Sequence, residues 1–575
     1  MDILLEYRNW LELCEGDEDL YGELRRIRDD PRAIEDRFYT ELSFGTGGMR
    51  GVLGAGTNRM NVFTVRRAAA GMALTLKADA DSRGKCVVIA YDSRKYSARF
   101  ARETALILAG RGITACLFDA LRPVPVLSFA VRHLNAAAGV VITASHNPPK
   151  YNGFKAYGPD GAQLSPDAAE GVTQAIRSLR YRDCVPMDEG EALQAGLMRI
   201  IGNEEVDEAY TRMVLGLMVR PELAALHGKD LPLVYTPLHG AGNLPVRRVL
   251  SRAGFSRVSV VAAQELPDPA FPTVKAPNPE DPAVFTLAIP LARETGASVI
   301  IATDPDCDRM GVCVRDSAGN FQTLTGNQIG CLLLHHILSG KQQSGTLPDN
   351  GAAVKSIVST EMAKAICEDF GVRLFDVLTG FKFVGETIQR FEETGEYTFL
   401  FGFEESFGYL SGTAVRDKDA VNAALLLAEL ALVCRHEGIT LYDRLEQLYR
   451  RYGYYCELVK SADYPGKTGM ESIARIMGSL RENPPSAMVG LKVLAKRDYL
   501  SGKRTSGGES SGMGYTPSDV LYLEMENHAW VCVRPSGTEP KVKVYTGVSH
   551  KESMEKAQLL GRRLLSEAEK LLAAE

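Results

Sequence analysis

The stretch CVVIAYDS at residues 86–93 decides the fold class, because it joins a run of apolar, β-branched residues to a polar turn. A helical segment around Leu106 follows, and GITACLF at residues 112–118 then supplies a second apolar run led by glycine. Continuous apolar runs that alternate with helices are typical of parallel sheets covered on both faces. The same order recurs twice, first with LPLVYTP (231–237) and GFSRVSVV (254–261), then with AVKSIVS (353–359) and GVRLFDVL (371–378).

This recurrence predicts an α/β protein with three consecutive α/β domains whose sheets are mixed or parallel. Beyond Cys456 the apolar runs are shorter, a Gly/Ser-rich loop covers residues 506–514, and we expect a long helix from His550 onward. The last part is therefore predicted to be a separate C-terminal α+β domain. The expected domain limits are 1–204, 205–323, 324–455 and 456–575.

Composition excludes several classes of protein. The 575 residues carry 66 Lys and Arg against 72 Asp and Glu, and this net charge of −6 does not favour binding to nucleic acid or to an anionic membrane surface. Eleven scattered cysteines without a C-x-x-C pair argue against a disulfide framework and a zinc ribbon. The sequence shows neither a signal peptide nor an apolar run long enough to span a bilayer. We therefore expect a cytoplasmic protein, a monomer or weak dimer, without nucleic-acid or membrane partners.

The sequence TASHNP at residues 143–148 follows an apolar run and so places Ser145 in a loop after a buried strand. Ligands of open α/β sheets bind at the carboxyl ends of strands, and a serine there can accept a phosphoryl group if a base or a cationic field activates it. His146 and Lys155 lie close by in the sequence. A plain turn is the alternative, since Asn-Pro favours turns, and the lack of G-x-S-x-G disfavours a serine esterase.

The sequence TDPDCDR at residues 303–309 places three carboxylates at alternate positions after a second apolar run. Side by side, these carboxylates would repel one another unless a cation neutralised them, and carboxylate oxygens are ligands that Mg²⁺ prefers. An EF-hand would need glycine and glutamate where this loop has Arg309 and Arg315, so that site is excluded. The remaining alternative, a solvated acidic turn, is disfavoured because the aspartates directly follow an apolar run that is expected to be a buried strand.

The sequence RPSGTEPK at residues 534–541 suits an anion. Arg534 offers a bidentate fork for phosphate, and the hydroxyls and backbone N–H groups around Gly537 can complete a nest. The spacing differs from that of a Walker A loop. A polar hairpin turn is the alternative interpretation.

The sequence GFEESFG at residues 402–408 offers two carboxylates and a hydroxyl between glycines, a combination that suits the hydroxyls of a sugar. The two carboxylates could instead be the acid/base pair of a glycosidase, but that would leave Ser145 and the aspartates without a role. TGFK (379–382) and RDKD (416–419) add cations nearby in the sequence, although such strings are also common in surface loops.

Together, and in this order, the four loops resemble those of the α-D-phosphohexomutase family over nearly the whole chain. Three further stretches fit its long branch, which includes phosphoglucomutases and phosphopentomutases. These are SFGTGGMRG (43–51), TPLHGAG (236–242) and FPTVKAPNPE (271–280).

The resemblance implies a role for each loop. Ser145 would carry the phosphoryl group, one Mg²⁺ would be bound by three aspartates and a phosphoserine oxygen, and Arg309 would lie beside the metal. The aspartates are Asp304, Asp306 and Asp308; the residues near the phosphoserine are Arg50, His146 and Lys155; those near the sugar are Thr379, Gly380, Lys382, Glu404, Ser406 and Lys418; and those around the non-transferring phosphate are Arg534, Ser536, Gly537 and Thr538.

The resemblance further implies small sugar phosphates as partners and a central cleft among the four domains. Glucose 1-phosphate and glucose 6-phosphate would be interconverted through phospho-Ser145, with glucose 1,6-bisphosphate as primer and intermediate. Ribose, deoxyribose or mannose phosphate are alternative substrates of the same family, and a metal-dependent sugar phosphatase is a further alternative.

One departure concerns proton transfer. The phosphomannomutase/phosphoglucomutase branch has a histidine soon after the serine of the sugar loop, whereas this sequence reads FGY at residues 407–409. The assignment of the general acid/base therefore remains open, with His146, Lys155 and Lys418 as candidates.

Overall fold

The computed structural model describes residues 2–45, 47–464, 469–536 and 541–572. The chain forms two compact units, each of which is described by itself. The first unit comprises Met1–Ile329, Phe381–Gly402 and Ser406–Leu441, and the second comprises Gly330–Gly380, Phe403–Glu405 and Tyr442–Glu575.

The first sheet of the first unit contains the deciding stretch 86–93 as its buried strand β2. The predicted parallel order is confirmed, because β2 pairs in parallel with both β3 and β4. Two antiparallel strands complete one side of the sheet, which is therefore mixed. The strand order is β1 (Gly48–Val52), β5 (Tyr151–Tyr157), β4 (Ala138–Ile142), β2 (Val87–Tyr91), β3 (Ala115–Phe118) and β6 (Met198–Ile201).

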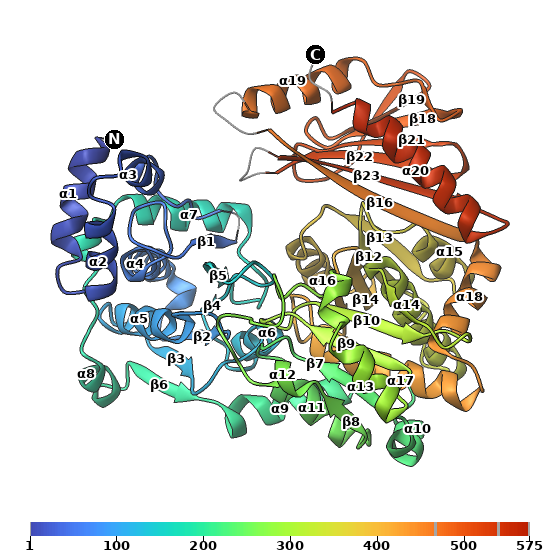
Figure 1. The fold of residues 1–575 in the computed structure, drawn as a ribbon, viewed down its shortest axis with the longest axis horizontal. Helices are drawn as coiled ribbons and strands as arrows, with labels where there is room; N and C mark the ends of the chain where they lie inside the picture. Colours follow the sequence, from blue (N-terminus) through green and yellow to red (C-terminus); the bar gives the residue numbers. More distant parts are fainter. Residues whose placement is uncertain (1, 46, 465–468, 537–540, 573–575) are drawn as a thin grey trace. The chain divides into compact units, whose positions relative to one another are not determined.

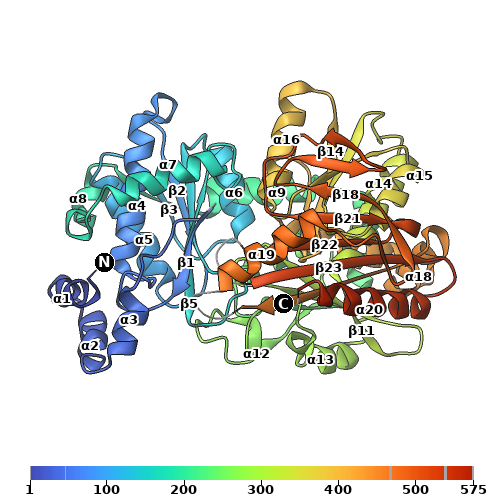
Figure 2. The same cartoon turned by 90° about the horizontal axis from the view of Figure 1, so that it is seen from above.

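Helices cover both faces of this sheet. Figure 2 shows α4 (Val62–Ala78) and α5 (Ser97–Ala109) on one face and α6 (Val124–His133) on the other. Val, Ile and Leu from the strands pack with the inner faces of α4 and α5 in one large core. The N-terminal segment folds into three short helices that join the same core, namely α1 (Ile3–Leu13), α2 (Glu18–Arg26) and α3 (Pro31–Phe38).

The second sheet of the first unit has parallel central strands and an antiparallel edge, so that it too is mixed. Its fully buried strand β9 turns directly back into β10, with Thr303 paired to Met310. The turn between these two strands carries the three aspartates. The strand order is β11 (Phe321–Leu324), β10 (Met310–Arg315), β9 (Val299–Thr303), β7 (Leu233–Thr236) and β8 (Val258–Val260).

The second unit contains a parallel pair, β12 (Gly351–Ser356) and β13 (Arg373–Val377), and a separate antiparallel C-terminal sheet. Figure 1 shows α20 (Met554–Lys570) lying along that sheet. The antiparallel sheet with its helices confirms the predicted α+β domain. The sheet contains β16 (Tyr454–Asp463), β17 (Ala487–Met488), β18 (Leu491–Asp498), β19 (Lys503–Ser506), β20 (Glu509–Gly512), β21 (Leu521–Met525), β22 (Trp530–Pro535) and β23 (Lys541–His550).

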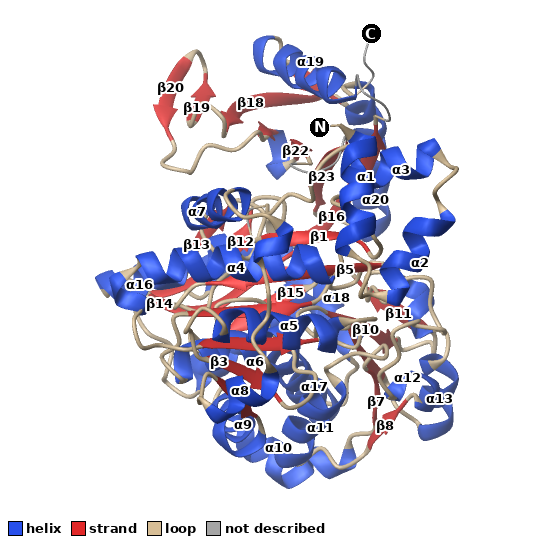
Figure 3. Ribbon diagram, turned by 90° about the vertical axis from the view of Figure 1, so that its left-hand side faces the viewer, coloured by secondary structure: helices blue, strands red, loops and turns tan. Residues whose placement is uncertain are grey.

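Two local predictions in this sheet are wrong. The stretch 506–514 is not a loop, because Gly507 and Gly508 adopt positive φ in a two-residue turn and join β19 to β20 in the hairpin visible in Figure 3. The last helix does not start at His550, which ends β23. It starts at Met554, because the Ser553 side chain accepts the Lys556 N–H and caps the helix there.

Candidate active site

The loop that carries Ser145 begins where β4 ends. Ser145 has φ +50°, in the left-handed region that costs energy for residues other than glycine, and its N–H donates to Thr143 Oγ1 at 2.9 Å. Gly153 of β5 lets that strand lie close to the loop, since a Cβ there would stand 2.5 Å from the Thr143 carbonyl oxygen. The loop is thus held in one strained conformation at the carboxyl edge of the first sheet.

Arg94 fixes this loop from beneath. Its buried guanidinium donates to the carbonyl oxygens of Ser145 at 2.6 Å, of Pro148 at 3.0 Å and of Tyr151 at 3.2 Å, and also contacts that of Asn147. The sequence analysis missed Arg94. The available signal was its position just after the buried strand β2, where charged residues of α/β proteins often serve a site.

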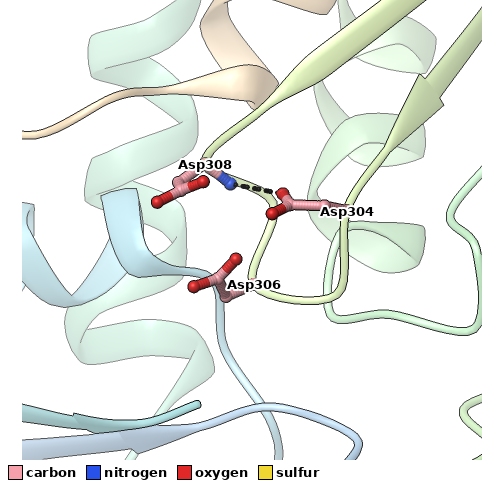
Figure 4. A group of neighbouring side chains, drawn as sticks. All are labelled: Asp304, Asp306 and Asp308. Carbon is pink, nitrogen blue, oxygen red and sulfur yellow. Dashed lines mark hydrogen bonds between the residues drawn. The ribbon is translucent and has the colours of Figure 1, made fainter. Parts of the chain in front are cut away.

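The three aspartates occupy the turn between β9 and β10, and Figure 4 shows their carboxylates gathered around a common space. Asp304, Asp306 and Asp308 are almost completely buried, and one oxygen of each lies within 4.8 Å of the others. Oδ1 of Asp304 accepts the N–H of Asp308 at 3.1 Å. Oδ1 of Asp306 and Oδ1 of Asp308 have no hydrogen-bond partner among the residues that the structure describes.

Ser145 lies directly against these aspartates. Its Oγ donates to Asp304 Oδ2 at 2.8 Å, although the two residues are 159 positions apart in the chain. Thr143 of the same loop donates from Oγ1 to Asp306 Oδ2 at 3.2 Å. A serine hydroxyl and a cluster of carboxylate oxygens therefore share one place in the first unit.

Two lysines face the carboxylates. Lys155, on β5, places Nζ 2.8 Å from Asp306 Oδ2 and 3.5 Å from Asp308 Oδ2. Lys418 places Nζ 3.1 Å from the same Asp308 oxygen and 2.9 Å from Asp417 Oδ1. These ammonium groups balance part of the negative charge of the cluster.

Burial and mutual repulsion shift the pKa values of the aspartates in different directions. The pKa of Asp304 is raised well above its ordinary value by burial and by the neighbouring charges of Asp306 and Asp308. Burial acts in the same direction on Asp308, but Lys418, Lys155 and Arg309 outweigh it and lower the pKa of that carboxyl. Three ionised carboxylates are thus disfavoured side by side at this place, and a bound cation would relieve that repulsion.

His146 and Arg50 lie on the outer side of the serine loop. His146 Nδ1 is 3.2 Å from Ser145 Oγ, and burial, followed by the charge of Arg309, lowers the pKa of the imidazole well below its usual value. Arg50, on β1, donates from Nη1 to Asn147 Oδ1 at 3.0 Å. The loop therefore has a neutral imidazole and an exposed guanidinium at its rim.

Arg309, at the end of the aspartate turn, contacts the end of the loop at residues 402–408. Its Nη1 donates to Glu280 Oε1 at 2.7 Å and to the Ser406 carbonyl oxygen at 3.1 Å. The chain at Met310 and Phe407 is joined by a backbone hydrogen bond of 3.1 Å. Ser406 consequently lies in the first unit together with the aspartates.

Most of the remaining predicted residues lie in the second unit. There the Gly380 N–H donates to Glu404 Oε1 at 2.6 Å, and the Arg534 guanidinium contacts the Thr379 hydroxyl. Ser536 directly follows β22, which carries Arg534 near its end. The structure therefore groups Thr379, Gly380, Glu404 and Arg534 within one unit. The predicted Gly537 and Thr538 lie outside the described residues.

Lys382 belongs to the first unit, where it begins α16 (Lys382–Thr394). Its ammonium lies 4.9 Å from the centre of the Phe383 ring, and burial lowers the pKa of the amine. Lys418 similarly lies 5.5 Å from the Phe381 ring. Aromatic rings thus border both lysines predicted for the sugar site.

Sequence comparisons agree with this geometry. Four domain models described as phosphoglucomutase/phosphomannomutase, three α/β/α domains and a C-terminal domain, match residues 41–183, 208–319, 325–452 and 520–559. The chain belongs to the phosphoglucomutase/phosphomannomutase family. Its predicted fold class, three α/β domains followed by a C-terminal α+β domain, is therefore confirmed.

Individual relatives of this family support the assignment. A protein of Staphylococcus haemolyticus named phosphoglucomutase is 38% identical over 90% of this chain and 92% of its own length, and one of Staphylococcus epidermidis with the same name is 39% identical over 94% and 96%. Among solved structures, one from Thermus thermophilus, assigned as a phosphomannomutase, superposes with a TM-score of 0.68 at 26% identity and covers 93% of this chain and 99% of that one. Through the described part of the chain, no helix is long and apolar enough to cross a membrane.

This phosphoglucomutase/phosphomannomutase chain also has a buried cation that the sequence analysis missed. Lys355 of β12 has its ammonium 3.0 Å from Glu361 Oε1 and 3.0 Å from Asp376 Oδ1, and it is fully buried. The next residue, Ser356, donates from Oγ to Glu405 Oε2 at 2.8 Å. A lysine within the otherwise apolar run 353–359 was the signal. The lysine supports the strand end that holds the second carboxylate of the sugar loop.

Proposed function

We propose that the chain is a phosphoglucomutase that interconverts glucose 1-phosphate and glucose 6-phosphate through phospho-Ser145. The observation that carries the proposal is the 2.8 Å contact between Ser145 Oγ and Asp304, inside a buried group of three carboxylates. A serine in that position can hold a phosphoryl group next to a bound cation. The name phosphoglucomutase of the staphylococcal relatives favours glucose as the sugar.

We propose Mg²⁺, one ion per chain, as the cofactor. The Oδ1 atoms of Asp306 and Asp308, which accept no hydrogen bond within the described ranges, fit a hard cation, and Asp304 with a phosphoserine oxygen would complete the set. When bound, the ion would neutralise charge on the phosphoryl oxygens. Lys155 and Lys418 would add to that neutralisation from the other side.

Proton transfer needs a group that is uncharged beside the serine. Lys155 and Lys418 are engaged in ion pairs with the aspartates, so their ammonium form is favoured. His146 is half-buried and neutral, and its Nδ1 already lies 3.2 Å from Ser145 Oγ. We therefore assign the proton acceptor to His146 and charge neutralisation to the two lysines.

The sugar phosphate would be recognised at two places. Arg534, with Ser536, Gly537 and Thr538, would bind the phosphate that is not transferred, because a guanidinium matches phosphate with two parallel hydrogen bonds. Glu404 and Ser406 would accept and donate hydrogen bonds with sugar hydroxyls. Since glucose 1,6-bisphosphate must present each of its phosphates to Ser145 in turn, one phosphate cradle would serve both orientations of the intermediate.

The domain limits 1–204, 205–323, 324–455 and 456–575 remain our proposal, supported by family matches that fall inside them. A cytoplasmic location is proposed as well, supported by eleven cysteines that all have free thiols. A monomer or weak dimer is proposed for the assembly, which sedimentation equilibrium would test.

The proposal is tested by incubating the protein with glucose 1-phosphate, ribose 1-phosphate and mannose 1-phosphate, each with Mg²⁺ and the matching bisphosphate primer. We expect isomerised sugar phosphate and the highest kcat/KM for glucose 1-phosphate. A higher value for ribose or mannose phosphate would assign the chain to another activity of the family, and release of free phosphate would indicate a phosphatase.

The matched variants are Ser145→Ala and Ser178→Ala, the latter at an exposed serine that ends α7 (Pro166–Arg177). Ser145→Ala should lower kcat on the order of 10³-fold or more while the circular dichroism spectrum is unchanged, and Ser178→Ala should retain activity. Phosphopeptide mapping after incubation with glucose 1,6-bisphosphate should place the label on residue 145. Near-normal turnover of Ser145→Ala would refute the phosphoserine.

A further inference from the structure

A polar cavity of about 420 Å³ lies in the first unit at the ends of β9 and β10 that point away from the aspartates. Ser298 and Val299 line it at the start of β9, and Arg315 lines it at the end of β10. The opposite wall is made by the last turn of α17 (Ala420–His436), including Arg435, and by residues 438–441. None of the residues to which a role was assigned above lines this cavity.

Two arginines of the lining are available to a ligand. The guanidinium groups of Arg315 and Arg435 are exposed and, within the described ranges, take part in neither an ion pair nor a hydrogen bond. Some exposed arginines of the same unit are paired, as in Arg252 with Glu208 at 2.6 Å, whereas others such as Arg293 are not paired with any residue that the structure describes. Arg315 and Arg435 differ from these single arginines in that both line one cavity. The cavity thus collects unneutralised positive charge in a protein whose net charge is −6.

The one carboxylate of the lining is already engaged. Asp316 accepts the Asn320 N–H at 2.8 Å and the Gln322 Nε2–H at 3.2 Å. Arg315 instead extends over Gly319, where even a Cβ would stand 3.4 Å from its Nη2 atom. Gly319 therefore leaves the guanidinium room beside the cavity, and Asp316 does not neutralise it.

We propose that this cavity binds a small phosphate-bearing ligand, either inorganic phosphate or a phosphate ester. Two guanidinium forks match the oxygens of a dianionic phosphate, and the hydroxyls of Ser298 and Ser317 can add neutral donors. A volume of about 420 Å³ is within the range of small-molecule sites and suits an ester of metabolite size.

Three elements connect this cavity with the aspartate cluster. β9 leads from the cavity to Asp304, and β10 leads back from Arg309. α17 starts after Asp419, next to Lys418, and has a length of about 25 Å, with Arg435 in its last turn. A ligand bound between Arg315 and Arg435 would therefore contact β9, β10 and α17 at one end, and the opposite ends of the same three elements adjoin the proposed catalytic groups. The inference goes beyond the proposed reaction and does not depend on it.

The test compares the full chain with the double variant Arg315→Gln/Arg435→Gln by equilibrium dialysis with inorganic phosphate and, separately, with glucose 6-phosphate. Phosphate also binds at the catalytic loops, so the readout is the number of ligands bound per chain at low ionic strength. We expect the double variant to bind one fewer, and each single variant to weaken that extra binding about tenfold, as expected for a lost charge-assisted contact.

The control is Arg177→Gln, which removes an exposed charge on α7 that lines no cavity described above, and it should leave the number of bound ligands unchanged. If phosphate and the ester both show the extra binding, the site recognises the phosphate group alone; if only the ester does, the site also recognises the sugar. An equal number of bound ligands in the full chain and the double variant with both probes would overturn the proposal. Mutase turnover without added phosphate should stay within about twofold in the double variant, so failure here is distinct from failure of the proposed function.

Discussion

Two buried ionic clusters of this protein, around Lys355 and around the three aspartates, differ in whether every charge has hydrogen-bond partners. Lys355 is closed in: its ammonium contacts Glu361 and Asp376 at 3.0 Å each and also donates to the carbonyl oxygens of Ser356 and Ser359. The aspartate cluster at residues 304–308 is open, because two of its carboxylate oxygens have no hydrogen-bond partner among the described residues. A buried charge that is fully bonded needs no ligand, and the fold is destabilised when its partner is removed, whereas a buried oxygen without a hydrogen bond indicates that a ligand is expected there.

The direction of the pKa shifts makes the same distinction. Burial alone would lower the pKa of Lys355, but Asp376 and Glu361 raise it, so this cation is retained. In the aspartate cluster, burial and the charges of Asp306 and Asp308 raise the pKa of Asp304, so the ionised form of this carboxyl is disfavoured until a cation binds beside it. The comparison predicts that the open cluster responds to magnesium and that the closed one does not.

The largest expected effect is at the open cluster. Asp308→Asn removes one of three predicted ligands, and we expect mutase turnover with Mg²⁺ to fall on the order of 10³-fold. The increase in melting temperature that Mg²⁺ gives the parent protein should also disappear, because metal binding to the folded state is what stabilises it. The measurements are steady-state turnover and thermal unfolding with Mg²⁺ or with a chelator.

Asp230→Asn is the matched control, since Asp230 is an exposed carboxylate of the same unit. It should leave both turnover and the magnesium response unchanged. A variant at residue 308 that kept more than about a tenth of the activity would show that the cluster does not bind the catalytic metal.

The closed cluster should fail differently. Lys355→Met leaves Glu361 and Asp376 without their shared cation, and we expect the free energy of unfolding to fall by about 3 kcal/mol. Because the two carboxylates are partly exposed, this is the low end for a broken buried pair. Urea unfolding of this variant and of Lys364→Met, an exposed lysine on α15 (Met362–Asp369), measures the loss. An equal loss with and without Mg²⁺ supports the distinction; a loss that Mg²⁺ repaired would contradict it.

Asp419 offers a third case, a buried carboxylate with hydrogen bonds but no cation. It accepts the Tyr210 hydroxyl at 2.8 Å and the Asn422 N–H at 2.9 Å, and burial raises the pKa of Asp419 to about 6. The folded state therefore binds more protons than the unfolded one between about pH 4 and pH 6, and stability falls as the pH rises through that window.

Asp419→Asn keeps the N-cap of α17 and removes this titration. At pH 7 we expect the variant to be more stable than the parent by up to about 3 kcal/mol, and the two should converge near pH 4. Asp188→Asn, at an exposed N-cap of α8 (Glu189–Gln194), should show no such divergence. Parallel urea titrations at pH 4, 5, 6 and 7 provide the measurement. If the free energies of unfolding of Asp419→Asn and the parent differed by the same amount at all four pH values, Asp419 would be ionised over the whole range.

The sequence allowed prediction of those features that neighbouring residues along the chain determine. β4 and β9 could be recognised as apolar runs, and the reactive groups directly follow them, so Ser145 and the three aspartates could be chosen before the structure was known. Arg94 and Lys355 could be noticed as charges at or in such a run, but their roles could not be predicted, because their partners are carbonyls and carboxylates that only the folded chain brings near. The hairpin at Gly507 was missed because glycine-rich turns and loops look alike in composition.

The smallest expected effect lies where the closed cluster meets the sugar loop. Ser356 Oγ holds Glu405 Oε2 at 2.8 Å and Ser359 Oγ at 2.8 Å, so Ser356→Ala removes the bond that fixes Glu405. Loss of one such bond costs about 1 kcal/mol, which predicts a rise in KM for glucose 1-phosphate of about fivefold with kcat nearly unchanged.

Ser359→Ala is the matched control, because it removes a hydroxyl from the same turn and leaves the Ser356–Glu405 bond in place. Its KM should change by less than about twofold. If the two alanine variants raised KM equally, the turn as a whole, and not the bond to Glu405, would set the affinity for the sugar. If only Ser356→Ala raised KM, the closed cluster would serve the site as well as the fold. Lys355 donates to the carbonyl of the same serine that positions Glu405.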